Sequence, residues 1–163
     1  YLRRLESASQ AGRFLPCETG VTELGKQLAL GYSCFALKTY YMLGLWDTLD
    51  AAKQTDWIHF IKSYQINGRY EDDEYTTNAF IDPALVDLHK PRNTFRQRVM
   101  YYFKPSNKLT MQQAVIIAET KQAIATLLEA GEAANAPYEG FPRSPEGVRK
   151  HIIMLQYVLE QTF

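Results

Sequence analysis

Four contiguous acidic residues, Glu71-Asp72-Asp73-Glu74, are the first candidates for chemistry in this chain. Carboxylates bind Mg²⁺, usually one or two of them together with phosphate oxygens and water. The run lies in a connection rich in hydroxyl groups, residues 71–78, which has too few apolar side chains to bury. A solvated loop that brings negative charge to the start of the next helix explains the same residues. The acidic run therefore marks a loop, and we expect no metal site there.

The cysteines and histidines do not form a catalytic or metal-binding pattern. Cys34 lies in an apolar stretch where a small buried thiol is the usual role, whereas a nucleophilic cysteine needs a base and an electropositive setting. His59, His89 and His151 lack the spacing of a zinc site. We expect no metal and no other cofactor, and the sequence leaves open whether Cys17 and Cys34 are bridged.

One segment is both basic and aromatic. It runs from Lys90 to Arg98 and is followed by Tyr101 and Tyr102. Such a patch could hold a phosphate, a sulfated sugar or a diphosphate, but a polar helix face with its rings turned to the core is the simpler explanation. The motifs of phosphate-binding glycine loops, zinc proteases and serine hydrolases are missing from the sequence.

Length and charge limit the class of protein. The 163 residues suit one domain, and 18 basic residues balance 18 acidic ones, so we expect no nucleic-acid partner. The stretch Leu28–Trp46 approaches the length of a membrane span, but Lys38 at its centre would oppose insertion by about 3 kcal/mol, so we expect no span. The chain is interpreted as a single helical domain, residues 1–163, that could be a fragment of a longer protein, and its compartment is undetermined.

Apolar residues recur at helical spacing along most of the chain, and no segment requires a strand. The expected helical segments are residues 1–12, a hairpin over 22–65 that turns at 46–48, and segments 82–90, 95–103, 110–128 and 144 onward. The connection 132–143 is long for a link between bundle helices, which makes it a candidate functional loop.

Local signals mark where these helices begin and end. Asp82 is suited to cap a helix whose first turn holds Pro83, and Thr110 with Gln113 forms the pattern of a capping box. Gly44 ends an apolar helix, because glycine accommodates the left-handed residue that commonly follows a last helical turn.

A weak internal repeat is also present. Residues Phe35–Gly44 align without gaps with Gln122–Gly131 and match at an alanine, a threonine and the final glycine. Each copy is followed by a loop and a second helix, and a middle hairpin at about residues 80–103 would lie between them. Repeated helical hairpins stack so that each buries the apolar face of its neighbour.

The end of the first hairpin resembles the α/α-toroid superfamily of squalene and terpene cyclases and protein prenyltransferase β subunits. In that group an aromatic-aliphatic pair, a glutamine and then glycine-x-aromatic mark the turn from an outer helix to the next inner one, and Phe60-Ile61, Gln65, Gly68 and Tyr70 fit the spacing. Glutamine at a helix end can satisfy free carbonyl or amide groups, and glycine permits the tight turn. The resemblance implies an all-α fold of antiparallel helical hairpins, an arc of a toroid rather than a closed barrel.

The resemblance also implies where a ligand would bind, because turns that enter inner helices rim the central cavity of such a toroid. We therefore expect the loops 70–78 and 132–143 to form the site, with Tyr70, Asp72, Asp73 and Tyr75 as ligand-binding residues and the catalytic residues unknown. The zinc constellation of the prenyltransferases is absent, since no aspartate precedes Cys34.

Three functions agree with these residues. The first is a helical-repeat scaffold or ligand-binding part of a larger toroid-type protein, with a small-molecule or glycan ligand. The second is part of the cavity wall of an enzyme acting on isoprenoid or carbohydrate substrates. The third is a protein–protein interaction module that self-associates or meets a missing flanking domain through an apolar edge at the final helix, which leads into Gln156–Phe163.

Overall fold

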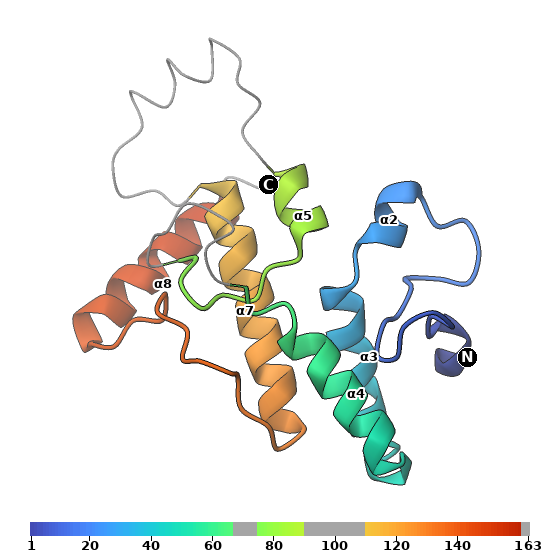
Figure 1. Ribbon diagram of the computed structural model, residues 1–163. Coiled ribbons are helices and arrows are strands. Elements are labelled where there is room, and N and C mark those ends of the chain that lie inside the picture. The colour runs from blue at the N-terminus through green and yellow to red at the C-terminus, as the bar shows by residue number, and fades with distance from the viewer. Residues whose placement is uncertain (67–74, 90–109, 161–163) are drawn as a thin grey trace.

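A computed structural model describes residues 1–66, 75–89 and 110–160 (Figure 1). The helices are α1 (Leu2–Leu5), α2 (Glu23–Gln27), α3 (Leu30–Met42), α4 (Ala51–Lys62), α5 (Pro83–Leu88), α7 (Met111–Glu129) and α8 (Pro145–Glu160), with a 3₁₀-helix η1 (Trp46–Thr48) between α3 and α4. These ranges contain no strand, only isolated β-bridges. The prediction of an all-α chain is confirmed for them.

The predicted helix starts are confirmed at two positions. The Asp82 carboxylate accepts a hydrogen bond from the Ala84 amide at 3.1 Å, and Pro83 occupies the first turn of α5. At the start of α7, the Thr110 hydroxyl accepts from the Gln113 amide while the Gln113 side chain accepts from the Thr110 amide. Both caps satisfy amides that a helix leaves without an internal partner.

Two predicted boundaries are wrong. The helix expected over residues 1–12 ends at Leu5, because the chain then turns back and the Leu15 amide donates to the Leu5 carbonyl. The first arm of the hairpin is broken at Ala29, whose backbone leaves the helical region between α2 and α3. Local sequence patterns do not record the bond between Leu15 and Leu5. They also do not record the partner of the Ala29 amide, which is Asp82, 53 residues further along the chain.

The larger of two core clusters surrounds Trp57 of α4, which is fully buried. Its indole ring stacks on Phe14 at a centroid distance of 4.5 Å and meets Tyr40 and Trp46 edge-on. Its Nε1 donates to the Ser33 hydroxyl at 2.8 Å. A buried tryptophan needs such a partner for its N–H, so one side chain fixes the N-terminal loop, α3 and α4 together.

Helices α3 and α7 run parallel and share more contacts than any other pair of described elements. Near the start of α3 the Gly31 carbonyl accepts from Gln122, and later in α3 Lys38 pairs with Glu129 at 3.7 Å, so the contacts advance in the same direction along both helices. The internal repeat aligns Phe35 with Gln122, so the spatial neighbour Gly31 lies about one helical turn earlier than the repeat implies.

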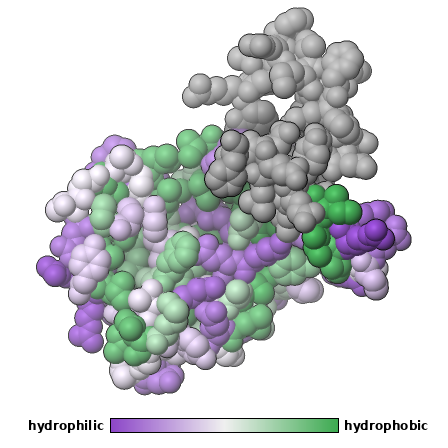
Figure 2. All heavy atoms as spheres, turned by 180° about the vertical axis from the view of Figure 1, so that it is seen from behind, coloured by the Kyte–Doolittle hydropathy of each residue, from purple (hydrophilic) through white to green (hydrophobic). Residues whose placement is uncertain are grey.

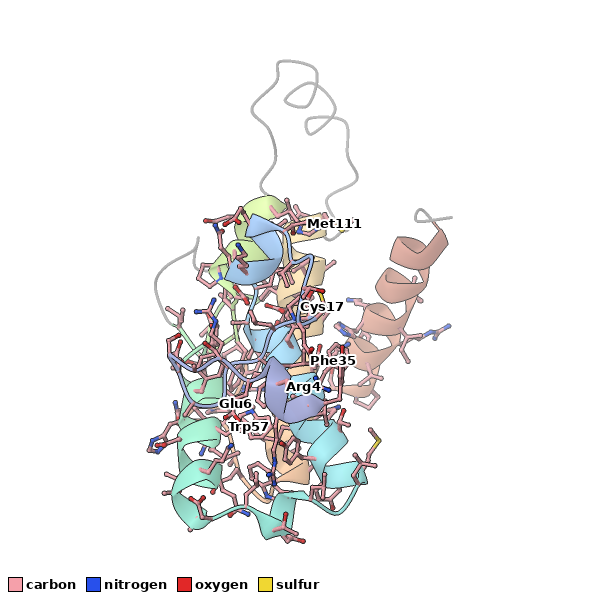
Figure 3. All side chains as sticks on the ribbon, turned by 90° about the vertical axis from the view of Figure 1, so that its right-hand side faces the viewer. Arg4, Glu6, Cys17, Phe35, Trp57 and Met111 are labelled. Atoms are coloured by element: carbon pink, nitrogen blue, oxygen red, sulfur yellow. The ribbon has the colours of Figure 1, made fainter. Side chains whose placement is uncertain are left out.

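The smaller core cluster joins α5 to α7 through Ile81, Val86 and Ile116, with Tyr138 from the long loop packed beside them. Helix α8 stands to one side of the other helices (Figures 1 and 3). Within the three described ranges, no helix is both long enough and apolar enough to cross a membrane.

The buried turn at Gly12 yields a test of the Trp57 core. Gly12 and Gly20 both have left-handed backbones, with φ of 76° and 77°, but a Cβ on Gly12 would lie 2.8 Å from the Trp57 Cα whereas nothing lies within 4 Å at Gly20. We expect Gly20→Ala to lower the free energy of unfolding by about 1 kcal/mol through backbone strain alone. Gly12→Ala should lower it by about 3 kcal/mol or more, because the clash with backbone adds to that strain.

Urea unfolding followed by tryptophan fluorescence measures both variants under the same conditions. Equal losses for the two variants would show that the close approach of Gly12 to Trp57 does not constrain the fold.

Candidate functional site

The two loops that the sequence marks as functional meet in space, at their described residues. The Asn78 side-chain amide donates to the Pro137 carbonyl at 2.9 Å, and the Glu139 amide donates to the Thr77 carbonyl at 3.3 Å. The Tyr138 hydroxyl donates to the Tyr75 carbonyl at 3.0 Å. We call residues 75–78 together with 136–141 the loop junction. In each of these bonds a backbone carbonyl is the acceptor, and in two of them a side chain is the donor.

Gln65, just beyond the end of α4, forms hydrogen bonds to both loops of the loop junction. Its Nε2 donates to the carbonyls of Asn78 and Ala136 at 2.8 and 2.7 Å, and its Oε1 accepts from the Ala136 amide at 3.2 Å. A primary amide has the donors and the acceptor for all three bonds. The sequence predicts a glutamine that satisfies free backbone groups here, and the structure shows those groups to belong to the two loops.

Asn78 has a left-handed backbone with φ of 58°, the only such non-glycine residue among those described. Asparagine tolerates this conformation better than most residues. The turn directs the Asn78 carbonyl to Gln65 and the Asn78 side chain to Pro137, so one residue serves both partners.

Tyr138 connects the loop junction to the smaller core cluster. Tyr138 is buried, packs edge-on against Phe141 at 4.9 Å and belongs to the α5–α7 core cluster. At the outer side Glu139 and Arg143 form an exposed ion pair at 2.7 Å. The junction therefore combines an apolar base with a charged edge.

The predicted ligand-binding residues are only partly covered by these ranges. Tyr75 is half-buried, and its backbone carbonyl is the acceptor of the Tyr138 hydroxyl. Tyr70, Asp72 and Asp73 lie outside the described residues, and their role stays a prediction. The basic segment 90–102 and the helix expected over 95–103 lie outside them too.

A buried carboxylate cluster lies directly after the loop junction. Asp82 is 2% exposed, and its Oδ2 accepts from the amides of Ala29 and Leu30 at 2.8 and 3.1 Å. Its other oxygen caps α5, and its own amide donates to the Glu119 carboxylate at 3.1 Å. One aspartate therefore connects the starts of α3 and α5 with the middle of α7.

Glu119 is 8% exposed, and burial raises the pKa of its carboxyl to about 7. The hydrogen bond from the Asp82 amide opposes this increase in the pKa, and repulsion from the Asp82 carboxylate adds to it. Beside it the Thr120 hydroxyl accepts from the Phe80 amide at 3.0 Å and lies 3.3 Å from the Phe80 carbonyl. Sequence reasoning missed Glu119, although a glutamate on the apolar helix face of Ile116 and Ala123 was a usable signal.

The remaining candidates for chemistry are separate from one another. Cys17 and Cys34 are both free thiols, and burial raises the pKa of Cys34 to about 12, so it stays protonated at neutral pH. The part of the chain outside the grey segments of Figure 1 contains no group of three or more histidine, cysteine or acidic side chains placed to hold a metal.

His59 and His151 have different surroundings. His59 is exposed and lines a shallow cavity of about 170 Å³ together with Trp46 and the ion pair of Lys62 and Glu132. His151 lies 3.0 Å from the Lys121 ammonium, and burial together with this charge lowers the pKa of its imidazole. The cavity is smaller than the roughly 300 Å³ at which pockets for drug-sized ligands begin.

Comparison with protein-family models, with curated proteins and with solved structures finds no match to this chain. The fold and the loop junction therefore have to be interpreted from their own geometry.

The three bonds of Gln65 provide a test of the loop junction. Gln65→Glu replaces the amide donor by an acidic oxygen that faces the carbonyls of Asn78 and Ala136, so we expect about 2 kcal/mol of destabilisation and faster hydrogen exchange at the Ala136 amide. The control is Gln54→Glu in the first turn of α4, where the side chain donates to Trp46 alone.

Amide exchange followed by NMR separates the two variants. Unchanged exchange at Ala136 and Glu139 in Gln65→Glu would contradict the assignment of Gln65 as the residue that joins the two loops.

Proposed function

We propose that this chain is an arc of an α/α toroid, built of antiparallel helical hairpins, that serves as the ligand-binding part of a larger protein. The parallel pairing of α3 and α7 supports this proposal, because the inner helices of toroid hairpins run parallel in a single curved layer. Gly44 and Gly131 support it too, since each ends one of these helices with a left-handed turn before the next element.

The observation that carries the proposed ligand site is the meeting of two loops that are some 60 residues apart in the sequence. Long loops carry function disproportionately, and a site whose backbone is already fixed loses less conformational entropy when it binds. Gln65 and the Tyr138 hydroxyl provide this preorganisation.

The proposed ligand is a small molecule or a glycan with hydroxyl groups. Tyr75 lies in the junction and Phe141 lies at its base, and aromatic faces of this kind stack on sugar rings or on apolar chains. Tyr70, Asp72 and Asp73 belong to the same proposed site, since carboxylates accept hydrogen bonds from ligand hydroxyls. The alternative role as a cavity wall in an enzyme for isoprenoid or carbohydrate substrates stays a prediction.

The test is a titration of the labelled chain with a glucose oligosaccharide and, separately, with farnesyl diphosphate. We expect amide shifts confined to residues 70–78 and 132–143 with one of the two ligands. Tyr75→Ala should weaken that binding at least about tenfold, because it removes the ring but keeps the backbone carbonyl that Tyr138 uses. The control variant is Tyr41→Ala, whose side chain is exposed on α3.

Shifts outside residues 70–78 and 132–143, or an equal loss of affinity in both tyrosine variants, would place the binding elsewhere. The absence of shifts with both ligands would remove the support for a glycan or isoprenoid site.

A second candidate function is a protein–protein interaction, favoured by exposed apolar residues at the end of α3. Tyr41, Met42, Leu43 and Leu45, here called the α3 apolar end, have exposed fractions of 50%, 76%, 62% and 40%. The molecule seen from behind shows hydrophobic residues interleaved with hydrophilic ones (Figure 2), as is common on protein surfaces. A contiguous apolar group at a helix end is less usual and indicates a contact surface.

If the α3 apolar end mediates self-association, the chain should dimerise with rising concentration. The double variant Met42→Gln, Leu43→Gln should shift the equilibrium at least about tenfold towards monomer with no loss of stability, because both side chains are exposed. Leu88→Gln, which changes an equally exposed leucine on α5, is the control. Light scattering after size-exclusion chromatography measures the mass, and a monomer at all concentrations would exclude self-association.

A further inference from the structure

Three helices meet at a pair of buried carboxyl groups. The Asp82 carboxylate holds the amides of Ala29 and Leu30 at the start of α3, and the Asp82 amide donates to Glu119 of α7. The segment 79–88, which contains Asp82 and α5, is therefore attached to α3 and α7 by these hydrogen bonds as well as by the buried apolar side chains of Phe80, Ile81 and Val86. The Phe80 amide adds one further bond to Thr120 of α7.

The charges that face this pair offer it little compensation. No lysine or arginine among the described residues forms an ion pair with Asp82 or Glu119. Among the described residues, the titratable groups that interact with Glu119 are Asp82, the Cys34 thiol of α3 and the Tyr64 phenol that follows α4. Two cations lie in the same region, since Lys38 acts on Cys34 and Arg13 on Tyr64, but neither forms an ion pair with Glu119. An ionised Glu119 therefore meets a second negative charge, on Asp82, in a site nearly closed to water.

We propose that Asp82 and Glu119 form an acid-tightened latch, in which protonation of Glu119 strengthens the attachment of segment 79–88 to α3 and α7. A neutral Glu119 keeps the carbonyl oxygen that accepts from the Asp82 amide and no longer repels the Asp82 carboxylate. Loss of the proton leaves two buried carboxylates within one hydrogen-bonded cluster, which favours an open segment where both reach water. This latch does not depend on the proposed ligand or on self-association.

The direction of the pH effect follows from proton linkage. The pKa of Glu119 is about 7 in the closed segment, against an ordinary value of 4.5 once the carboxyl reaches water. The closed segment therefore binds more protons than the open one between these two values. Its extra stability is full below about pH 4.5, declines as the pH rises towards 7 and is lost above that value.

Residue-resolved hydrogen exchange of the whole chain from pH 5 to pH 8 tests this proposal. After correction for intrinsic rates, the opening constant at the Ala29, Leu30 and Asp82 amides should rise by up to about tenfold per pH unit as far as pH 7, and then level off. Glu119→Gln should abolish this dependence, because glutamine keeps an acceptor for the Asp82 amide but does not titrate.

Glu129→Gln is the matched control, since it makes the same change on α7 at an exposed position paired with Lys38. It should retain the dependence of the wild type. The proposal is overturned if the opening constants of the wild type are flat with pH, if all three proteins respond alike, or if the Trp57 amide on α4 responds by the same factor, which would indicate global unfolding.

A second measurement needs no variant and therefore does not depend on whether Glu119→Gln folds. The side-chain carboxyl carbon of Glu119 is followed by NMR across the same pH range. A titration midpoint near 7 supports the latch, and a midpoint near 4.5 overturns it.

Discussion

The start of α3 is the constraint on which the arrangement of the helices depends. Ala29 and Leu30 are each 1% exposed, so their amides cannot be hydrated and need a partner inside the protein. The Asp82 carboxylate, more than 50 residues further along the chain, is that partner. Because Asp82 also caps α5, the position of α5 is tied to the start of α3, and Glu119 ties both to α7.

The same requirement organises the rest of the molecule. Gln65 satisfies backbone groups of both loops, and the Thr120 hydroxyl satisfies the Phe80 amide within the core. The Ser33 hydroxyl donates to the Gly12 carbonyl and accepts from Trp57. In each case a side chain replaces the water that a buried backbone group or indole has lost.

Part of this fold can be predicted from the residues alone. The caps at Asp82 and Thr110 and the left-handed glycine after α3 are local, because the capping groups and the amides they satisfy lie within three residues of each other. The short α1 and the break at Ala29 were not predictable, since both depend on hydrogen bonds to residues far away in the sequence. The role of Gln65 was predicted in its chemistry, but its partners were not.

The candidate site, like the fold, was predictable from the sequence only in part. Composition and turn residues mark the loops 70–78 and 132–143, because proline, glycine and polar residues cannot continue an apolar helix. Two findings are facts of tertiary structure. The described parts of these loops meet, and Glu119 faces Asp82 without an ion pair to any basic side chain that the structure describes.

The sequence by itself determined the helical class and the positions of several helix ends, since helix periodicity and capping act over a few residues. Tertiary structure decided which helices run side by side and which carboxyl groups are buried together. Those choices depend on satisfying buried backbone amides across long separations, and no local pattern records them.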